Sequence, residues 1–188
     1  MIRKEKIALF GGTFDPIHKG HLALAKLAHF QIELDRILFI PCRQSPQKNK
    51  APAANAQQRC DMINLVTKTL DWGELSRIEI DRNTPSFTWQ TSLYYSRQFP
   101  QCELYWILGT DQWKEIHTWA EPERLRKRLT FIVATRDGEE VEERPGWRHI
   151  TLPFENEANA TQIRSGESKA EWLTAPVAQY IETNKIYS

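Results

Sequence analysis

The sequence has few cysteines and no long apolar run, and each shortage excludes a class of protein. Its three cysteines, Cys42, Cys60 and Cys102, are odd in number and far apart. They match neither a disulfide framework nor a Cys-x-x-Cys zinc site, and this usage is typical of a reducing cytoplasm. No segment approaches the ~20 apolar residues that a membrane helix needs. The apolar run near the N-terminus is also too short for a secretory signal. We therefore expect a cytoplasmic protein without a membrane segment.

The net charge is also close to zero. The chain has 25 Lys and Arg residues against 24 Asp and Glu residues, which gives a formal charge of +1. Proteins that bind nucleic acid or acidic membranes without specificity carry a broad positive field, and this composition supplies none. We therefore expect neither a nucleic acid nor a membrane as partner, and any anion must be recognised locally. The composition leaves a homo-oligomer open.

The glycine motifs of common nucleotide-binding proteins are missing as well. Gly11 and Gly12 follow an apolar run, but the sequence has no G-x-G-x-x-G, and "GGTFDPIHKG" does not match G-x-x-x-x-G-K-[ST]. This argues against a dinucleotide-dependent dehydrogenase and against a P-loop ATPase. His18 and His21 have no third ligand nearby and no H-E-x-x-H pattern, so we predict no metal site.

The chain does contain a regular alternation of apolar runs and helical patterns. Its 188 residues, 40% of them hydrophobic, are enough for one domain over residues 1–188 with a buried core. Strands are predicted at 6–10, 36–40, 76–80, 104–108, 130–135 and 148–152. Helical periodicity follows the first two, with Asn55 as the predicted N-cap of the second helix. This order predicts an α/β, Rossmann-like, doubly wound and mostly parallel sheet with helices on both faces.

Two polar loops follow predicted strands, and ligands of open α/β sheets bind at the carboxyl ends of strands. Residues 44–55 include the basic Lys48 and Lys50, so this loop is a candidate for binding an anion. Residues 136–147 are acidic, and we interpret them as a solvated excursion.

The stretch "GGTFDPIHKGH", residues 11–21, predicts a local anion site. A strand that ends in glycines and leads into a helix near His18 brings backbone N–H groups and the positive end of a helix dipole together. His18 and His21 share one face of the first turn and could each donate a hydrogen bond to a phosphate oxygen. The alternative is that one histidine caps the helix and the other packs in the core.

This stretch resembles the G-G-T-F-D-P-x-H-x-G-H signature of the nucleotidylyltransferase superfamily, and in particular of the bacterial nicotinate mononucleotide adenylyltransferases. The resemblance continues at "RCDM" (59–62), "TPSFTWQT" (84–91), "WILGTDQW" (106–113) and "ATQIRSG" (160–166), and so covers almost the whole chain. The sequence departs from the family pattern at four positions, Gln47, Gln90, Asn159 and Ala160.

The resemblance implies a single nucleotidylyltransferase domain that transfers the adenylyl group of ATP to nicotinate mononucleotide. The products would be nicotinate adenine dinucleotide and pyrophosphate, in NAD biosynthesis. Because the attacking phosphate is already an anion, catalysis would consist of positioning and charge stabilisation. ATP would be a co-substrate and would bring Mg²⁺ with it, since no carboxylate cluster is dedicated to the ion. The implied phosphate-contacting residues are His18, His21, Arg164 and Lys48, with Arg164 at the start of a helix beside Thr161.

The same resemblance implies two sets of binding residues. The adenylyl side would be lined by Gly11, Gly12, Thr13, Phe14, Gly109, Asp111 and Thr161. Asp111 would accept ribose hydroxyls, although it could equally serve as an N-cap. Phe87, Thr88 and Trp119 would take the pyridine mononucleotide, because its ring suits an aromatic face and its carboxylate suits backbone donors. We expect Trp106 in the core.

Two alternatives remain open. One is an adenylyltransferase for nicotinamide mononucleotide or for another phosphate acceptor. The other is a binding or sensing protein that keeps the fold and has lost turnover.

Overall fold

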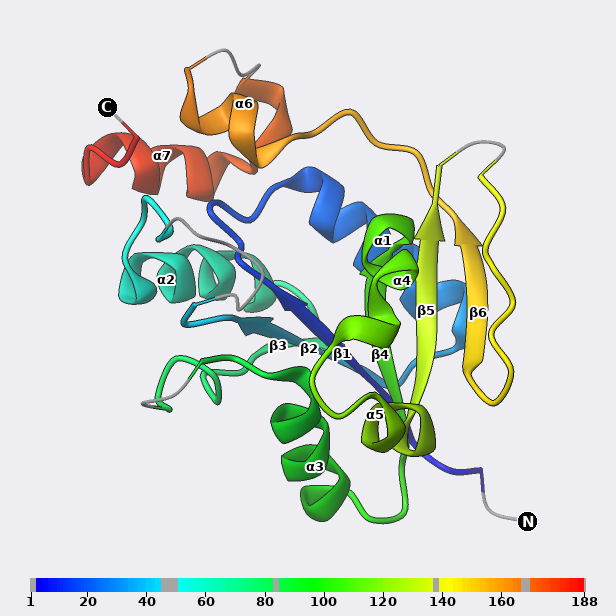
Figure 1. The fold of residues 1–188 in the computed structure, drawn as a ribbon. Helices are drawn as coiled ribbons and strands as arrows, with labels where there is room; N and C mark the ends of the chain where they lie inside the picture. Colours follow the sequence, from blue (N-terminus) through cyan, green and yellow to red (C-terminus); the bar gives the residue numbers. More distant parts are fainter. Residues whose placement is uncertain (1–2, 45–50, 83–84, 137–138, 167–169, 188) are drawn as a thin grey trace.

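The protein is built on a six-stranded parallel sheet, with strand order β3-β2-β1-β4-β5-β6 (Figure 1). The computed structural model describes residues 3–44, 51–82, 85–136, 139–166 and 170–187. The strands are β1 (Lys6–Gly12), β2 (Arg36–Pro41), β3 (Gly73–Leu75), β4 (Glu103–Gly109), β5 (Leu129–Thr135) and β6 (Arg148–Pro153). The predicted α/β class is confirmed.

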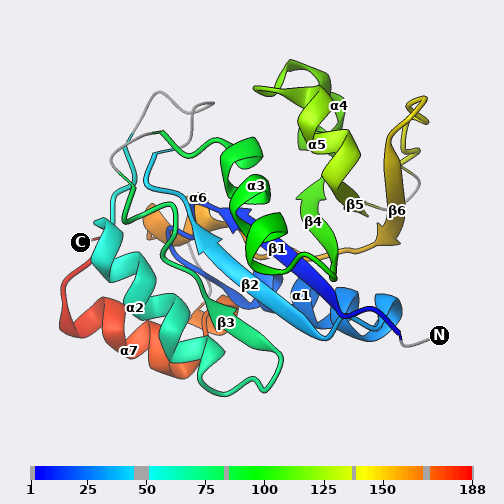
Figure 2. The ribbon, with the colours of Figure 1, turned by 90° about the horizontal axis from the view of Figure 1, so that it is seen from below.

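Helices cover both faces of this sheet, as Figure 2 shows. One face carries α1 (Lys19–Ile32), α2 (Ala56–Thr67) and α7 (Ala175–Thr183). The other carries α3 (Thr88–Gln98), α4 (Thr110–Lys114), the 3₁₀ turn η1 (Ile116–Thr118) and α5 (Pro122–Arg128). The short α6 (Ala160–Arg164) and the turn η2 (Ala170–Trp172) connect β6 to α7.

Burial on both sides explains why the inner strands β1, β2, β4 and β5 are apolar over most of their length, whereas the edge strand β6 is mostly exposed. In β1, Ala8 and Phe10 belong to the core under α1, α2 and α7, while Ile7 and Leu9 belong to the opposite core. Successive side chains of a strand point to opposite faces, so a strand covered on both sides needs apolar residues at every position. The predicted N-cap of α2 is also confirmed, because the side chain of Asn55 accepts a bond from the Gln58 N–H.

One predicted strand was wrong. Residues 76–80 do not form a strand, because β3 ends at Leu75. The Ser76 N–H still donates to the Phe39 carbonyl at 2.9 Å, but the chain then leaves the sheet. Glu79 lies instead against α3, where its carboxylate accepts a hydrogen bond from the Thr91 hydroxyl at 2.7 Å. β3 itself starts at Gly73, where an added Cβ would lie 2.8 Å from a Leu70 methyl group.

The acidic segment after β5 was interpreted from the sequence as a solvated excursion, but its described part contacts α4. The Glu139 carboxylate accepts hydrogen bonds from the Thr110 hydroxyl at 2.7 Å and from the Lys114 ammonium at 3.0 Å. The Glu142 carbonyl accepts a bond from the Trp113 indole N–H at 2.9 Å. These contacts hold the described part of the segment against α4, because α4 supplies donors for the Glu139 carboxylate and for the Glu142 carbonyl.

Within the described ranges, no helix combines the length and the apolar character that crossing a membrane requires.

Candidate active site

The loop from β1 to α1 is held by backbone contacts with the end of β2. The Cys42 N–H donates to the Gly12 carbonyl at 2.9 Å. Phe14 adopts a left-handed backbone with φ of 48°, a conformation that costs a non-glycine residue about 1–2 kcal/mol. Its ring is buried and packs edge-on against Phe10 at 5.4 Å between centroids, which holds the loop in this shape. A Cβ on Gly11 would collide with the Trp106 indole, so this glycine lets Trp106 pack against β1.

The Arg59 side chain links this loop to the end of β2. It is 1% exposed, and its Nη1 donates to the Thr13 carbonyl at 2.8 Å and to the Cys42 carbonyl at 2.7 Å. A single buried guanidinium thus fixes the spacing between the carboxyl ends of two neighbouring strands. The sequence pointed to this residue only through the "RCDM" motif.

Asp15 forms a second buried junction in the same loop. Its carboxylate accepts hydrogen bonds from the Ala53 and Ala54 N–H groups at 2.8 and 3.0 Å and from the Tyr187 hydroxyl at 2.6 Å. Burial, followed by this contact with Asp15, raises the pKa of Tyr187. The backbone carbonyl of Asp15 accepts a further bond from Arg164 Nη1 at 2.8 Å. Asp15 therefore joins the loop to the segment before α2 and to the C-terminal part of the chain.

The two histidines lie together at the start of α1. His18 is the N-cap residue, and its backbone N–H donates to Nδ1 of His21 at 3.2 Å. Their ring centroids are 3.7 Å apart. In neutral His21 the proton must then sit on Nε2, because Nδ1 acts as the acceptor. Burial lowers the pKa of His18 to about 4, so His18 is neutral at neutral pH. Its Nδ1 is buried and has no partner within the described part of the chain.

A first cavity of about 620 Å³ opens beside this loop. Most of the residues that the sequence assigned to nucleotide binding lie in its wall: Gly11, Gly12, Thr13, Phe14, Phe87, Thr88, Gly109 and Trp119. Trp106 also lines it, in addition to its expected place in the core. Gly11 to Phe14 and Gly109 were predicted on the adenylyl side, and Phe87, Thr88 and Trp119 on the pyridine side, so this one cavity is lined by residues of both predicted sets.

A second cavity of about 850 Å³ lies on the other side of the histidines. Among its lining residues are His18, Asp111, Asn156 and Glu157. Asp111 lies in the first turn of α4 and is not its N-cap, because Gly109 holds that position. The N-cap alternative for Asp111 was therefore wrong, and its exposed carboxylate faces the cavity region.

The two cavities meet at His21, Leu24 and Gly109, which line both. A Cβ placed on Gly109 would find no atom within 4 Å, so the backbone here borders open space. A ligand in either cavity can therefore approach both the His21 ring and the Gly109 backbone.

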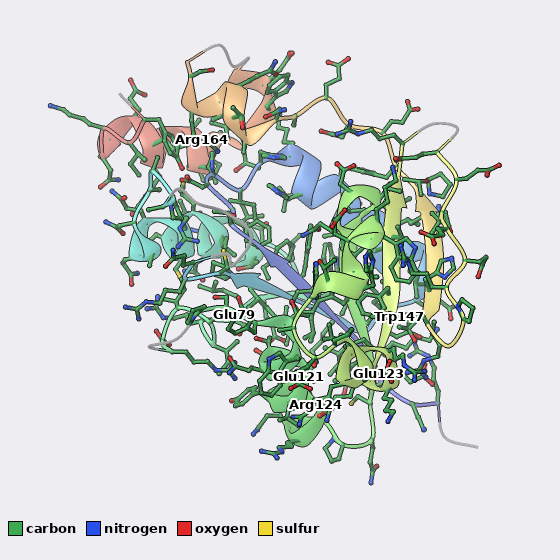
Figure 3. All side chains as sticks on the ribbon, in the orientation of Figure 1. Glu79, Glu121, Glu123, Arg124, Trp147 and Arg164 are labelled. Carbon is green, nitrogen blue, oxygen red and sulfur yellow. The ribbon has the colours of Figure 1, made fainter. Side chains whose placement is uncertain are left out.

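Arg164 and Thr161 take a different position from the one predicted. Arg164, labelled in Figure 3, is the last residue of α6 and not its first. Its Nη2 donates to the Thr161 hydroxyl at 3.1 Å. Neither residue is among those that line the two cavities. Asn159 caps α6 by accepting a bond from the Thr161 N–H at 2.8 Å. Lys48 and Gln47 lie outside the described residues.

Glu79 is a residue of the first cavity that the sequence did not single out. It is 4% exposed, and burial raises the pKa of its carboxyl, although the Thr91 and Ser86 hydroxyls oppose the shift. An acidic residue inside an apolar run was the available signal, and the mistaken strand at 76–80 hid it.

In the described part of the chain, no group of three or more His, Cys, Asp or Glu side chains could hold a metal ion. The walls offer instead backbone N–H groups, imidazoles and aromatic faces, which suit an anionic, ring-bearing ligand.

Comparison with known proteins gives a consistent result. Residues 9–166 match the model of the family described as cytidylyltransferase-like. A Thermus thermophilus protein named "Probable nicotinate-nucleotide adenylyltransferase" is 38% identical over 186 residues, covering 97% of this chain and 99% of the relative. A Methylacidiphilum infernorum protein of the same name is 35% identical over 198 residues, covering 100% and 96%.

A solved structure shares the fold. The nicotinic acid mononucleotide adenylyltransferase of Plasmodium falciparum, determined in complex with NaAD, superposes with a TM-score of 0.79 at 19% identity and covers 97% of both chains.

Proposed function

The chain belongs to the cytidylyltransferase-like family, and we propose that it acts as a nicotinate-nucleotide adenylyltransferase. It transfers the adenylyl group of ATP to nicotinate mononucleotide and releases pyrophosphate, a step of NAD biosynthesis. The observation that carries this proposal is the pair of cavities that share His21 and Gly109. One cavity takes the acceptor, the other takes ATP, and the reacting phosphates meet between them.

The first cavity suits the pyridine mononucleotide. Trp119 supplies an aromatic face for the ring, and α3 begins at Thr88 with the positive end of its dipole toward the cavity. The Phe87 N–H already donates to the Pro85 carbonyl at 3.1 Å. We therefore assign the ring carboxylate to the Thr88 end of the helix.

The second cavity suits Mg-ATP, with the Mg²⁺ arriving as part of the substrate. His18 lies in its wall with a buried Nδ1 that has no partner among the described residues, and Asp111 offers a carboxylate to ribose hydroxyls. Arg164, Thr161 and Lys48 remain proposed phosphate contacts.

The reaction needs little covalent help from the protein. An acceptor phosphate oxygen attacks the α-phosphorus of ATP, a new P–O bond forms, and the bond to pyrophosphate breaks. The nucleophile is an anion, so no proton has to be removed from it. Charge spreads over the phosphoryl oxygens, and we propose that the Nε2–H of His21, which lines both cavities, donates to one of them.

We also propose that residues 1–188 act as one nucleotidylyltransferase domain in the cytoplasm. The three cysteines support the location, because none of them forms a disulfide.

Pyrophosphate release from Mg-ATP tests the function, with nicotinate mononucleotide, nicotinamide mononucleotide and pantetheine phosphate each added alone. We expect release with nicotinate mononucleotide, and His21→Ala should lower kcat by about 100-fold, as for the loss of one oxyanion donor. His29→Gln, on the last turn of the same helix, is the matched control and should keep its kcat. If ATP binds but releases no pyrophosphate with any of the three acceptors, the binding protein is favoured instead.

A further inference from the structure

Glu79 places a carboxyl group in the wall of the proposed acceptor cavity. Glu79, labelled in Figure 3, is the only carboxylic acid among the described residues that line the cavity, whose lining also includes Ser86, Phe87 and Thr88. Its Oε1 accepts a hydrogen bond from the Thr91 hydroxyl at 2.7 Å, and the residue is 4% exposed. The mechanism described above does not use this group.

The position of Glu79 conflicts with the charge of the proposed acceptor. Nicotinate mononucleotide carries a ring carboxylate, which we assign to the Thr88 end of α3 on the same wall. Two carboxylates that share a poorly solvated site do not both stay ionised, because each raises the pKa of the other. Burial already raises the pKa of Glu79 before any ligand binds, so it is the group that takes the proton.

We propose that Glu79 is a specificity-determining residue of the acceptor cavity: its protonated form admits the acid ring, and its ionised form favours the amide ring. This inference rests on the proposed function. The proton comes from solvent, is held on a carboxyl oxygen of Glu79 while the acid is bound, and returns to solvent when the ligand leaves. An ionised Glu79 would instead accept a hydrogen bond from the amide NH₂ of nicotinamide mononucleotide.

Several charged or titratable groups face this carboxyl or share its cavity. Arg82 comes from the same segment as Glu79 and favours the ionised form, as do the neutral hydroxyls of Ser86 and Thr91. On the opposite walls, His21 comes from α1 and Cys42 follows β2. A test must therefore separate Glu79 from these two residues.

The experiment compares two acceptors with the same enzyme. kcat/KM is measured for nicotinate and nicotinamide mononucleotide at saturating Mg-ATP, between about pH 6.5 and about pH 8.5, and the acid-to-amide ratio is plotted. Titration of ATP, of the acceptor phosphates and of the phosphate-binding residues cancels in this ratio, as does any difference in folded fraction. Above the pKa of Glu79 in the complex, the ratio should fall by up to about tenfold per pH unit. A ratio that changes by less than about twofold over this range would overturn the proposal.

The variant Glu79→Gln tests whether the pH dependence of the acid-to-amide ratio comes from Glu79. Glutamine keeps the size of the side chain and an oxygen that can accept from Thr91, but it does not titrate. The ratio should become independent of pH in this variant, while Glu74→Gln, at an exposed acid on β3, should keep the wild-type slope. A slope that survives in Glu79→Gln would place the titrating group elsewhere, at His21 or Cys42, and would overturn the assignment.

The two proposals fail in different ways. If neither mononucleotide yields pyrophosphate, the proposed function and this inference fall together. If both are turned over with a constant ratio, the adenylyltransferase stands and only the role of Glu79 is wrong.

Discussion

The burial of His18 has a direct consequence for stability. Its pKa is about 4 in the folded protein, against 6.5 for an unperturbed histidine. Folding therefore favours the neutral ring, and the unfolded chain takes up a proton first as the pH falls. The stabilisation is fully present above about pH 6.5 and is lost between about pH 6.5 and about pH 4. At 1.36 kcal/mol per pKa unit, the gap between 6.5 and about 4 corresponds to about 3 kcal/mol.

Urea unfolding of the wild type and of His18→Gln measures this loss. Carboxylates also titrate in acid, so the quantity to follow is the difference in unfolding free energy between the two proteins at each pH. The free energy of unfolding of the wild type, measured relative to His18→Gln, should fall by about 2 kcal/mol between about pH 8 and about pH 5. Only the wild type loses the contribution of a neutral His18. His29, His117 and His149 are present in both proteins and cancel.

An NMR titration of the imidazole protons gives a second, independent measurement. We expect one histidine to titrate near 4 in the wild type and its signal to be missing in His18→Gln. If His18 titrates at about 6 or above, or if the free-energy difference does not depend on pH, the argument from burial is refuted.

Two further predictions concern the framework and the acceptor. Arg59→Met should lower the free energy of unfolding by about 3 kcal/mol, because a charged donor is removed from the part-buried Thr13 carbonyl and from the buried Cys42 carbonyl. Urea unfolding measures this, and a loss below about 1 kcal/mol would contradict the junction. Trp119→Ala should raise the KM of both pyridine mononucleotides by about tenfold or more, through the lost ring contact, and should leave the KM of ATP within about twofold. Steady-state kinetics measures both constants, and an equal rise in the KM of ATP would contradict the proposed contact between Trp119 and the acceptor.

The fold was predictable because its signal is local. The inner strands β1, β2, β4 and β5 each contain an unbroken apolar run, and a run buried on both faces can be read without knowing its neighbours. The error at 76–80 has the opposite origin. Both 73–75 and 76–80 can be read as strands, and only the pairing of Gly73 to Leu75 with β2, together with the contact between Glu79 and Thr91, decides between them. A short stretch of sequence does not predict such contacts between distant residues.

The candidate site also has parts that local sequence predicts and parts that depend on contacts between distant residues. The position of the loop that carries His18 and His21, between β1 and α1, was predicted from the sequence. Its glycines, its histidines and the start of α1 are consecutive in the chain. The position of Arg164 was not predicted, because it depends on where α6 ends and on a bond to the carbonyl of Asp15, nearly the whole chain away. Its proposed role toward ATP stays a prediction.

The meeting of the two cavities follows from the topology of the sheet. From β1 the chain moves outward to β2 and β3, then returns to the other side of β1 and continues through β4, β5 and β6. The loops after β1 and β4 therefore leave neighbouring strands in different directions, and a crevice opens between them at the carboxyl end of the sheet. His21 follows β1, and Gly109 ends β4. Two stretches far apart in sequence thus come to line one junction, and the chemistry of the junction depends on what each loop brings to it. The loop after β1 brings an imidazole with a fixed tautomer, and the end of β4 brings a glycine that leaves room for a phosphate to approach the backbone.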